Sequence, residues 1–501
     1  DSFTYRTSKF IRRNLRQVSA AAMMAFIVVC VVAFFMVRLT RARDEAVASA
    51  ARMHEVEKFM LNLFDGGDKE AGPPDSMRVV SLVNRGVQQA RTLNSQPVVQ
   101  AQLYDTLGNV YHKLGDFKRA DSLLQLSLKR WRELSGPDDP DVVGSLVDLG
   151  LLRASEARFD EAESLTRQAL AIAKKVLRPD APALGTTMAA LGQVLEGRGE
   201  YTKAIEVLEQ AVRQQSASNA DPADLAASLT ELANCHFYAG HYKIADALNH
   251  QVLKMDERIY GGQHPSVADD LINLGAIQLQ WGACDHAEIF DRRALEIERA
   301  WYGNDHPETA SAMTILGRAL ACQGKNVEAS SLLQQALTVE KEIYGAVHPR
   351  VASTLNELGG IALKRGQLDE AEKIYREQES IYRSVYGEKH YLTVLGEANR
   401  GKVYLARKQY GNAEKIFRDV VRRDTEILSA NHQFTAVARI ELGRSLLRQH
   451  HFVEAEKQSR LGYELLIKTS PHDPWLTYAR QDLTEIYSAL GRPEEAQQYQ
   501  K

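Results

Sequence analysis

A Leu-Gly pair that returns about every 42 residues is the feature that most constrains how this 501-residue chain can fold. An alanine follows twelve residues after the glycine position in ten successive copies. The pairs begin at Leu107, Leu149, Leu191, Leu274, Leu316, Leu358 and Leu442, with the variants Leu232-Ala233, Arg400-Gly401 and Leu483-Thr484 in register. A fixed period of this length is typical of a repeat array, in which each unit contacts its neighbours.

Each copy has the pattern of a helix, a tight turn and a second helix. An aromatic or apolar residue such as Phe117 or Tyr201 lies three residues before most of the alanines, and a glycine such as Gly115 or Gly199 often lies two residues earlier. Glycine and alanine let helices approach closely, and a turn glycine can end a helix in the left-handed conformation. A helix pair cannot bury its apolar stripe alone, so the pairs must stack. The sequence therefore predicts an all-α fold: a right-handed α-solenoid of about ten helix pairs over residues 98–501, with a concave face.

This pattern resembles the tetratricopeptide repeat, and the 42-residue step and the loops Tyr260–Pro265, Tyr302–Pro307 and Tyr344–Pro349 look like the kinesin-light-chain type. Each loop carries one histidine, a residue type that can bind metal or act as a base. Histidines one repeat apart cannot converge on a metal, so we interpret them as helix caps, each followed by a proline that starts a helix. We predict no catalytic residue, no metal site and no cofactor. The four cysteines show no pairing pattern, and Cys235, Cys284 and Cys322 are predicted to be buried thiols.

In this family the first helix of each repeat lines the groove. It often does so through the positions one and five residues after the glycine of the recurring Leu-Gly dipeptide, which we call the Leu-Gly mark. Carried over, these positions include Tyr238 and Gln280, and in the C-terminal half they are mostly basic. The candidate peptide groove comprises Arg318, Lys364, Lys402, Arg444 and Arg448. Guanidinium groups pair well with carboxylates, so an acidic protein or peptide ligand is the predicted partner. The alternative is a solvated face neutralised by Glu357, Glu441 and Asp482.

An apolar run over residues 18–37 contains no charge and no proline. Its length matches a bilayer core, which predicts a transmembrane helix rather than a secretory signal peptide. Five Lys/Arg precede the run and four follow it within 38–57, which slightly favours the N-terminus inside and the repeats outside the cytoplasm. Residues 1–43 carry a net charge of +7, which leaves −10 on the rest of the chain and argues against nucleic acid as a partner.

The first 110 residues resemble the region C-terminal to the catalytic domain in bacterial membrane-anchored serine/threonine protein kinases with C-terminal tetratricopeptide repeats. The resemblance rests on Phe3–Arg13, Arg41–Glu45, Val56–Asp65, Asn84–Gly86 and Gln96–Leu103. It implies a kinase domain upstream of Asp1, although the chain itself has no kinase motif and is not predicted to be an enzyme.

The predicted organisation combines these observations. It comprises a basic juxtamembrane segment (1–17), the transmembrane helix (18–37), a juxtamembrane helix (38–64), a linker (65–74), a capping helix (75–97) and the solenoid (98–501). The predicted function is a membrane-tethered interaction or sensor module, with dimerisation possible. A free-standing membrane-anchored scaffold without a kinase and a cytoplasm-facing adaptor are the alternatives.

Overall fold

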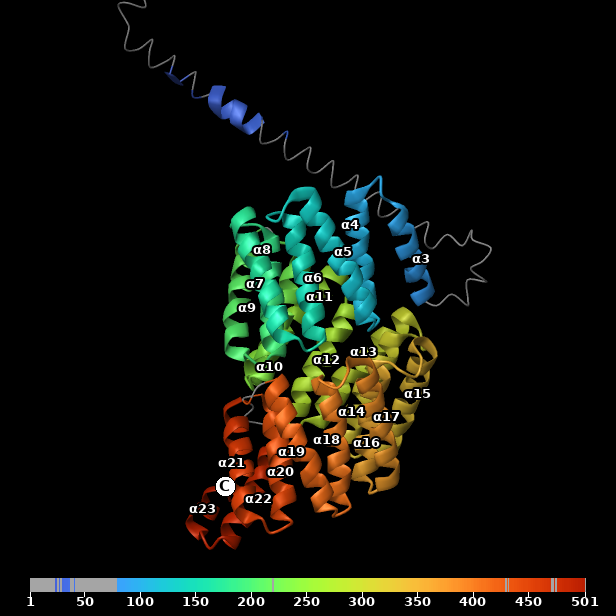
Figure 1. Cartoon of the computed structure of the whole chain (residues 1–501), viewed down its shortest axis with the longest axis vertical. Helices are drawn as coiled ribbons and strands as arrows, with labels where there is room; N and C mark the ends of the chain where they lie inside the picture. The colour runs from blue at the N-terminus through green and yellow to red at the C-terminus, as the bar shows by residue number, and fades with distance from the viewer. Residues whose placement is uncertain are drawn as a thin grey trace, which may run out of the picture. The chain divides into compact units, whose positions relative to one another are not determined.

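The computed structural model is helical throughout the part of the chain that it describes, which is residues 79–500 except 219, 429, 431, 470–472 and 474, together with 23, 24, 27, 29–36 and 40 (Figure 1). No strand occurs among these residues. The helices are α3 (Val79–Thr92), α4 (Pro97–Lys113), α5 (Phe117–Ser135), α6 (Pro140–Ser155), α7 (Phe159–Val176), α8 (Pro182–Gly197), α9 (Tyr201–Ala217), α10 (Pro222–Tyr238), α11 (Tyr242–Tyr260), α12 (Pro265–Gln280), α13 (Cys284–Tyr302), α14 (Pro307–Cys322), α15 (Asn326–Tyr344), α16 (Pro349–Lys364), α17 (Leu368–Tyr386), α18 (Tyr391–Ala406), α19 (Tyr410–Ile427), α20 (Gln433–Leu447), α21 (Phe452–Thr469), α22 (Trp475–Ala489) and α23 (Pro493–Gln498).

The chain divides into two compact units, Asp1–Leu103 and Tyr104–Lys501. In the first unit, α3 lies within the range predicted for a capping helix, and Gln100 Nε2 donates to the Ala90 carbonyl at 2.9 Å. The predicted segments 1–17, 38–64 and 65–74 lie outside the described residues, apart from Thr40. Their assignments, like the capping role of α3, stay predictions.

The predicted membrane helix is corrected by the structure. Within the residues that it describes, every helix is too short or too polar to cross a bilayer. The predicted single-pass membrane location with extracytoplasmic repeats was therefore wrong, and the transmembrane helix and the membrane contact through it are not supported.

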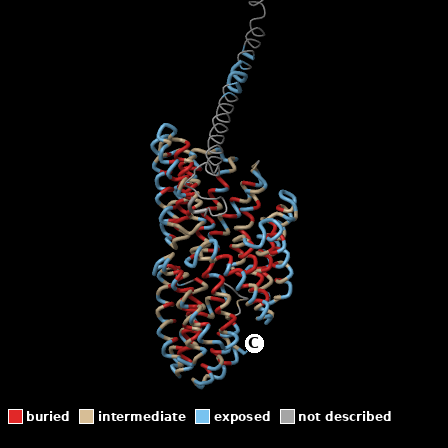
Figure 2. Tube along the Cα trace, turned by 90° about the vertical axis from the view of Figure 1, so that its right-hand side faces the viewer, coloured by how far each residue is buried: buried red, intermediate tan, exposed pale blue. Residues whose placement is uncertain are grey.

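The predicted helix pairs are confirmed, and the Leu-Gly mark explains how each pair closes. The glycine on the first helix faces the residue sixteen positions later on the second helix. A Cβ placed on Gly192 would lie 2.5 Å from Leu208 Cγ, and one on Gly401 would lie 2.7 Å from Phe417 Cζ. Leu208 and Phe417 are fully buried, as are nine of the ten repeat alanines, while the tenth, Ala496, is 3% exposed. Small residues thus bring the helices into close contact, and the buried residues follow the helix contacts (Figure 2).

The histidines of the loops between pairs cap the following helix, as predicted. In each loop, Nδ1 accepts a hydrogen bond from the backbone N–H two residues later; the histidines are His264, His306, His348, His390 and His432. Four of the rings also stack on the tyrosine four residues earlier, with centroids 4.0 Å apart for Tyr302 and His306. This cap satisfies an otherwise unpaired N–H at the start of the helix.

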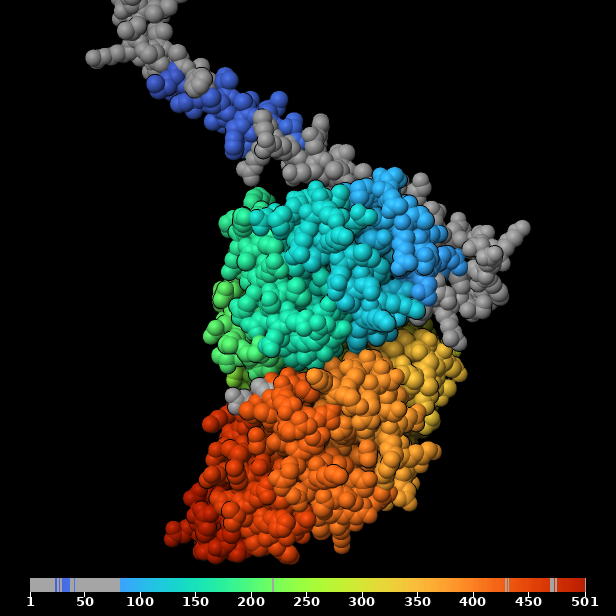
Figure 3. Space-filling model, in the orientation of Figure 1, coloured from blue at the N-terminus to red at the C-terminus, as the bar shows by residue number. Residues whose placement is uncertain are grey.

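The solenoid also contacts itself across a full turn. We call the turns inside pairs the turn edge and the loops between pairs the loop edge. His390 Nε2 lies 3.1 Å from the Ser155 carbonyl oxygen, 235 residues away in the chain. A Cβ on Gly115 would lie 3.8 Å from His348 Nε2, and one on Gly199 would lie 2.7 Å from His432 Cδ2. The loop edge before α16, α18 and α20 therefore rests on the turn edge of the first pairs, which Figure 3 shows as green and orange halves in contact.

Candidate functional site

A cavity of about 570 Å³ lies on the face formed by the first helices of four successive pairs, α10, α12, α14 and α16. Its lining is mixed: aromatic and aliphatic residues from α10 and α12, and charged residues from α14 and α16. The polar lining residues are Tyr238, Asn273, Gln280, Arg318, Glu357 and Lys364. Concave, partly apolar sites with a few polar groups are typical ligand-binding sites.

The structure brings together two of the five predicted groove residues, Arg318 and Lys364, in this cavity. Tyr238 and Gln280, which the repeat positions also indicated, line it with them. The other three predicted residues lie further along the solenoid, where acidic residues of the next pair neutralise them. Their ion pairs are Lys402–Glu441 at 3.9 Å, Arg444–Asp482 at 3.0 Å and Arg448–Glu485 at 2.7 Å.

Two of these three ion pairs, those of Lys402 and Arg444, follow a rule of the repeat. The residue one position after a mark contacts the residue two positions before the next mark. Asn109 donates to Asp148 at 2.8 Å in this way, and the Lys402 and Arg444 ion pairs join the same positions. Glu441 and Asp482 thus neutralise the preceding repeat rather than their own helix. The rule assigns Glu357 to Arg318, but among the described residues no ion pair within 4.0 Å joins them.

Arg318 consequently forms no ion pair within 4.0 Å with a described carboxylate, although its charge acts on the nearby Asp291. Its Nε is buried and has no hydrogen-bond partner there. Lys364 is exposed and also forms no ion pair in the described part of the chain. An unpaired buried donor costs free energy until a ligand satisfies it, so this part of the cavity favours an anionic group.

Asp291 lies behind this site and was missed by the sequence analysis. It occupies the position that faces the mark glycine, where other repeats place Leu208, Tyr375 or Phe417. The side chain is 1% exposed, and neither carboxylate oxygen has a hydrogen-bond partner among the described residues. Burial raises the pKa of Asp291 to about 7, while the nearby Arg318 charge lowers it. The available signal was that Asp291 is the one charged residue in a column whose other members are uncharged.

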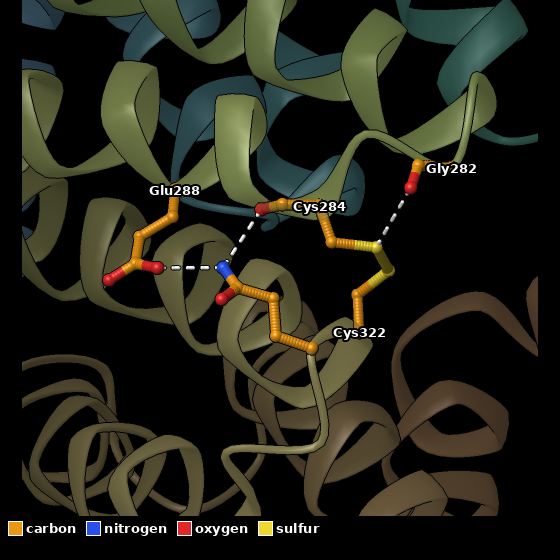
Figure 4. The surroundings of a disulfide bond; sticks show 5 residues. Gly282, Cys284, Glu288 and Cys322 are labelled. Atoms are coloured by element: carbon orange, nitrogen blue, oxygen red, sulfur yellow. Dashed lines mark hydrogen bonds between the residues drawn. A yellow bond between two sulfur atoms is a disulfide. The ribbon is translucent and has the colours of Figure 1, made fainter.

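A disulfide joins Cys284 and Cys322 at the rim of the cavity, which corrects the prediction of buried thiols (Figure 4). Cys284 begins α13 and Cys322 ends α14, so both lie on the turn edge of neighbouring pairs, with Cα atoms 5.8 Å apart. Gln323 Nε2 braces the turn by donating to the Cys284 carbonyl at 3.0 Å and to Glu288 Oε2 at 2.6 Å. Spacing within one repeat could not show a bond formed between repeats. Cys235 is a free, fully buried thiol, as predicted.

A larger hollow of about 990 Å³ lies between α18 and α19. Most of its charged lining is already paired: Arg400 contacts Glu379 at 2.7 Å, and Arg418 contacts Glu414 at 2.6 Å, while Lys415 forms no ion pair among the described residues. It therefore offers an anionic ligand less than the Arg318 cavity does. In the part of the chain that the structure describes, no group of three His, Cys, Asp or Glu side chains is placed to hold a metal ion.

Tetratricopeptide-repeat models match residues 99–175, 143–217, 224–300, 287–342 and 392–468, and a second such model matches 351–391. Together these matches cover well over half of the chain. The chain belongs to the tetratricopeptide repeat family. Tetratricopeptide helix pairs are the fold that the sequence predicted, and their stacking forms the cavity.

The chain is similar to several known proteins of this kind. It is 28% identical over 101 residues to a TPR repeat-containing protein of Dictyostelium discoideum; the match covers 20% of the chain and only 6% of that relative. A putative kinesin light chain from Podosopora anserina is 24% identical over 41% of the chain and 97% of that structure, with a TM-score of 0.36. A Rap protein complexed with Competence and Sporulation Factor is 12% identical over 70% of the chain and 99% of that structure, with a TM-score of 0.45.

Proposed function

We propose that this tetratricopeptide-repeat protein is a protein-interaction module that binds an acidic peptide segment in the cavity at Arg318 and Lys364. The observation that carries the proposal is the unpaired Arg318 guanidinium at the repeat position where other basic residues are neutralised. A carboxylate of the ligand would take the place that Asp482 takes beside Arg444. The apolar part of the cavity, including Phe237 and Ile272, would hold an adjacent apolar side chain.

The proposal restricts the predicted groove, which comprised five basic residues, to the two nearest the N-terminus, Arg318 and Lys364. Lys402, Arg444 and Arg448 would contribute little, because a ligand would first have to break their existing ion pairs. A bidentate guanidinium–carboxylate contact contributes about 1.5–3 kcal/mol. Loss of the Arg318 contact should therefore weaken binding by at least tenfold.

A peptide array tests this proposal. The array carries acidic, neutral and basic peptides of matched length and apolar content, and it is probed with the wild-type chain, Arg318→Gln and Arg448→Gln. We expect the wild type and Arg448→Gln to bind the acidic set selectively, and Arg318→Gln to lose that binding. Equal binding by Arg318→Gln and the wild type, or no preference for acidic peptides, would refute the proposal.

The connection to a serine/threonine kinase stays a prediction. It depends on the resemblance over residues 1 to about 110, most of which lies outside the described residues. Immunoblotting of the native protein with an antibody to the repeats would test it. A product far larger than 56.0 kDa with kinase activity would support the connection, and a product near 56.0 kDa without activity would contradict it.

A further inference from the structure

The two sulfur atoms of the Cys284–Cys322 disulfide lie in different surroundings (Figure 4). Cys322 is exposed, ends α14 and lines the cavity of about 570 Å³. Cys284 is half-buried, begins α13 and lies outside that lining. A disulfide exchanges when a thiolate attacks one of its sulfur atoms, and the rate depends on access to that atom. The greater exposure of Cys322 therefore favours attack there.

Two cationic side chains line the cavity together with Cys322. Arg318 precedes Cys322 by four residues on α14, a spacing that makes two side chains neighbours on one helix face. Lys364 comes from α16, and Glu357 is the one carboxylate in the lining, so the charged lining is net positive. Because the buried Arg318 Nε has no hydrogen-bond partner among the described residues, a molecule that carries carboxylates is attracted to the part of the cavity beside Cys322.

The helix ends favour Cys284 as the sulfur that leaves. The N-cap of α13, Ala283, makes no side-chain cap hydrogen bond, so it does not satisfy the backbone N–H groups of the first turn. The helix dipole stabilises a thiolate at this N-terminal end and destabilises one at the C-terminal end of α14, where Cys322 lies. Asp285 beside Cys284 and Arg318 near Cys322 have the opposite effect. The exposure of Cys322 is therefore the stronger of the two arguments.

We propose that Cys322 is a covalent exchange site for peptide thiols that carry carboxylates. The ligand thiolate attacks the Cys322 sulfur and forms a mixed disulfide with it. The bond to Cys284 breaks, and its electron pair leaves with the Cys284 sulfur, which takes a proton from water. The reaction is an exchange, so the ligand thiol is the only co-reactant that it needs. Cys284 later attacks the mixed disulfide, restores the original bond and releases the ligand.

The proposal has two parts with different foundations. The preference for carboxylates rests on the proposed function, because both use the Arg318 guanidinium. The choice of Cys322 over Cys284 rests on exposure, on the cavity lining and on the helix ends. The site of the adduct and its dependence on ligand charge are therefore measured separately.

Glutathione is the probe, because it is a peptide thiol with free carboxylates. Its dimethyl ester is the matched control, with the same thiol and without the carboxylates. The full-length chain is incubated with either thiol, stopped with N-ethylmaleimide to block free thiols, digested and analysed by mass spectrometry. We expect glutathione on Cys322 and N-ethylmaleimide on Cys284. An adduct on Cys284 instead, or no adduct on Cys322, would overturn the assignment.

Arg318→Gln measures the effect of ligand charge. For each variant, the rate with glutathione is divided by the rate with the ester, so that the intrinsic reactivity of the thiol cancels between variants. We expect this ratio to be about tenfold higher in the wild type than in Arg318→Gln. Arg448→Gln should retain the wild-type ratio, because Arg448 lies outside the cavity lining and is paired with Glu485 at 2.7 Å. Equal ratios in all three chains would overturn the preference for carboxylates.

Cys284→Ala tests the release step. When excess glutathione is removed, the wild type should lose its adduct and regain the Cys284–Cys322 bond. Cys284→Ala, loaded with oxidised glutathione, should keep the adduct on Cys322 because the releasing thiol is missing. A persistent adduct in both chains would overturn the role of Cys284. Circular dichroism checks that each variant is folded.

The results also separate this proposal from the proposed function, because binding on the peptide array needs no thiol. Selective binding of acidic peptides through Arg318, with no adduct on Cys322, would overturn only the exchange site. An adduct on Cys322 with equal ratios, together with no preference for acidic peptides on the array, would refute the anion site that both proposals share.

Discussion

Substitution of Gly199 by alanine measures how much the contact between the two turns of the solenoid stabilises the protein. Gly199 has a φ of 82° in the turn between α8 and α9, and Gly324 has a φ of 77° in the turn between α14 and α15. Alanine in the left-handed region costs about 1–2 kcal/mol at either position. Only at Gly199 would the added Cβ also meet another part of the chain, 2.7 Å from His432 Cδ2.

The additional cost at Gly199 comes from the role of the His432 ring. A heavy-atom distance of 2.7 Å cannot be kept, so the ring must move. Its Nδ1 accepts the Phe434 backbone N–H at 3.2 Å and caps α20. Loss of a helix N-cap costs about 0.5–2 kcal/mol. We therefore expect Gly199→Ala to lower the free energy of unfolding by roughly 1.5–4 kcal/mol and Gly324→Ala by only about 1–2 kcal/mol, so that the difference between the two variants is about 0.5–2 kcal/mol.

Urea denaturation gives the two stability losses, and hydrogen exchange identifies their source. The Phe434 amide should exchange faster in Gly199→Ala and at the wild-type rate in Gly324→Ala. Equal losses of unfolding free energy in the two variants, with unchanged protection of the Phe434 amide, would show that Gly199 does not contact His432 across the solenoid turn.

Three further predictions concern the core, the buried carboxylates and the disulfide. Phe417→Ala should lower the free energy of unfolding by about 3–5 kcal/mol, because Phe417 is fully buried against Gly401. Val453→Ala, at a 74% exposed position, should change it little, and urea unfolding of the two variants compares these effects. Burial raises the pKa of Asp270 and Glu196 to about 8, far above the values near 4 in the unfolded chain. These groups therefore keep their protons in the folded state, and the free energy of unfolding falls progressively as pH rises from about 4 towards 8. Between pH 7 and 8 the buried histidines are neutral, so the melting temperature should fall, and Asp270→Asn should reduce the fall; a flat profile would contradict the assigned burial. The Cys284–Cys322 bond spans 38 residues, so a reducing phosphine should lower the unfolding free energy by about 4 kcal/mol, with no effect on Cys284→Ala/Cys322→Ala. If the melting curve is unaffected by reduction, the bond is not formed in solution.

The sequence was sufficient to predict the local packing but not the contacts between distant repeats. Equivalents of Gly192, Ala204 and the loop histidines recur because the repeats close in the same way: the alanine occurs in ten copies, the glycine in eight and the capping histidine in five. The neutralisation of Arg444 by Asp482 follows a second rule that links neighbouring repeats, which only the stacked geometry reveals. The Cys284–Cys322 bond and the contact of His390 with Ser155 depend on the rise and rotation of each repeat. The residue pattern within a repeat does not determine these quantities closely enough.

The contact across one turn has a consequence for how such a chain can vary. Because the repeats follow a screw operation, every whole repeat added at the C-terminus brings another loop opposite another turn about 233 residues earlier. A chain can therefore gain or lose complete 42-residue units and keep the contact, with one anchoring point more or fewer. An insertion of half a unit shifts every later histidine away from its turn at once. Length variation in this solenoid is thereby restricted to whole repeats by geometry alone.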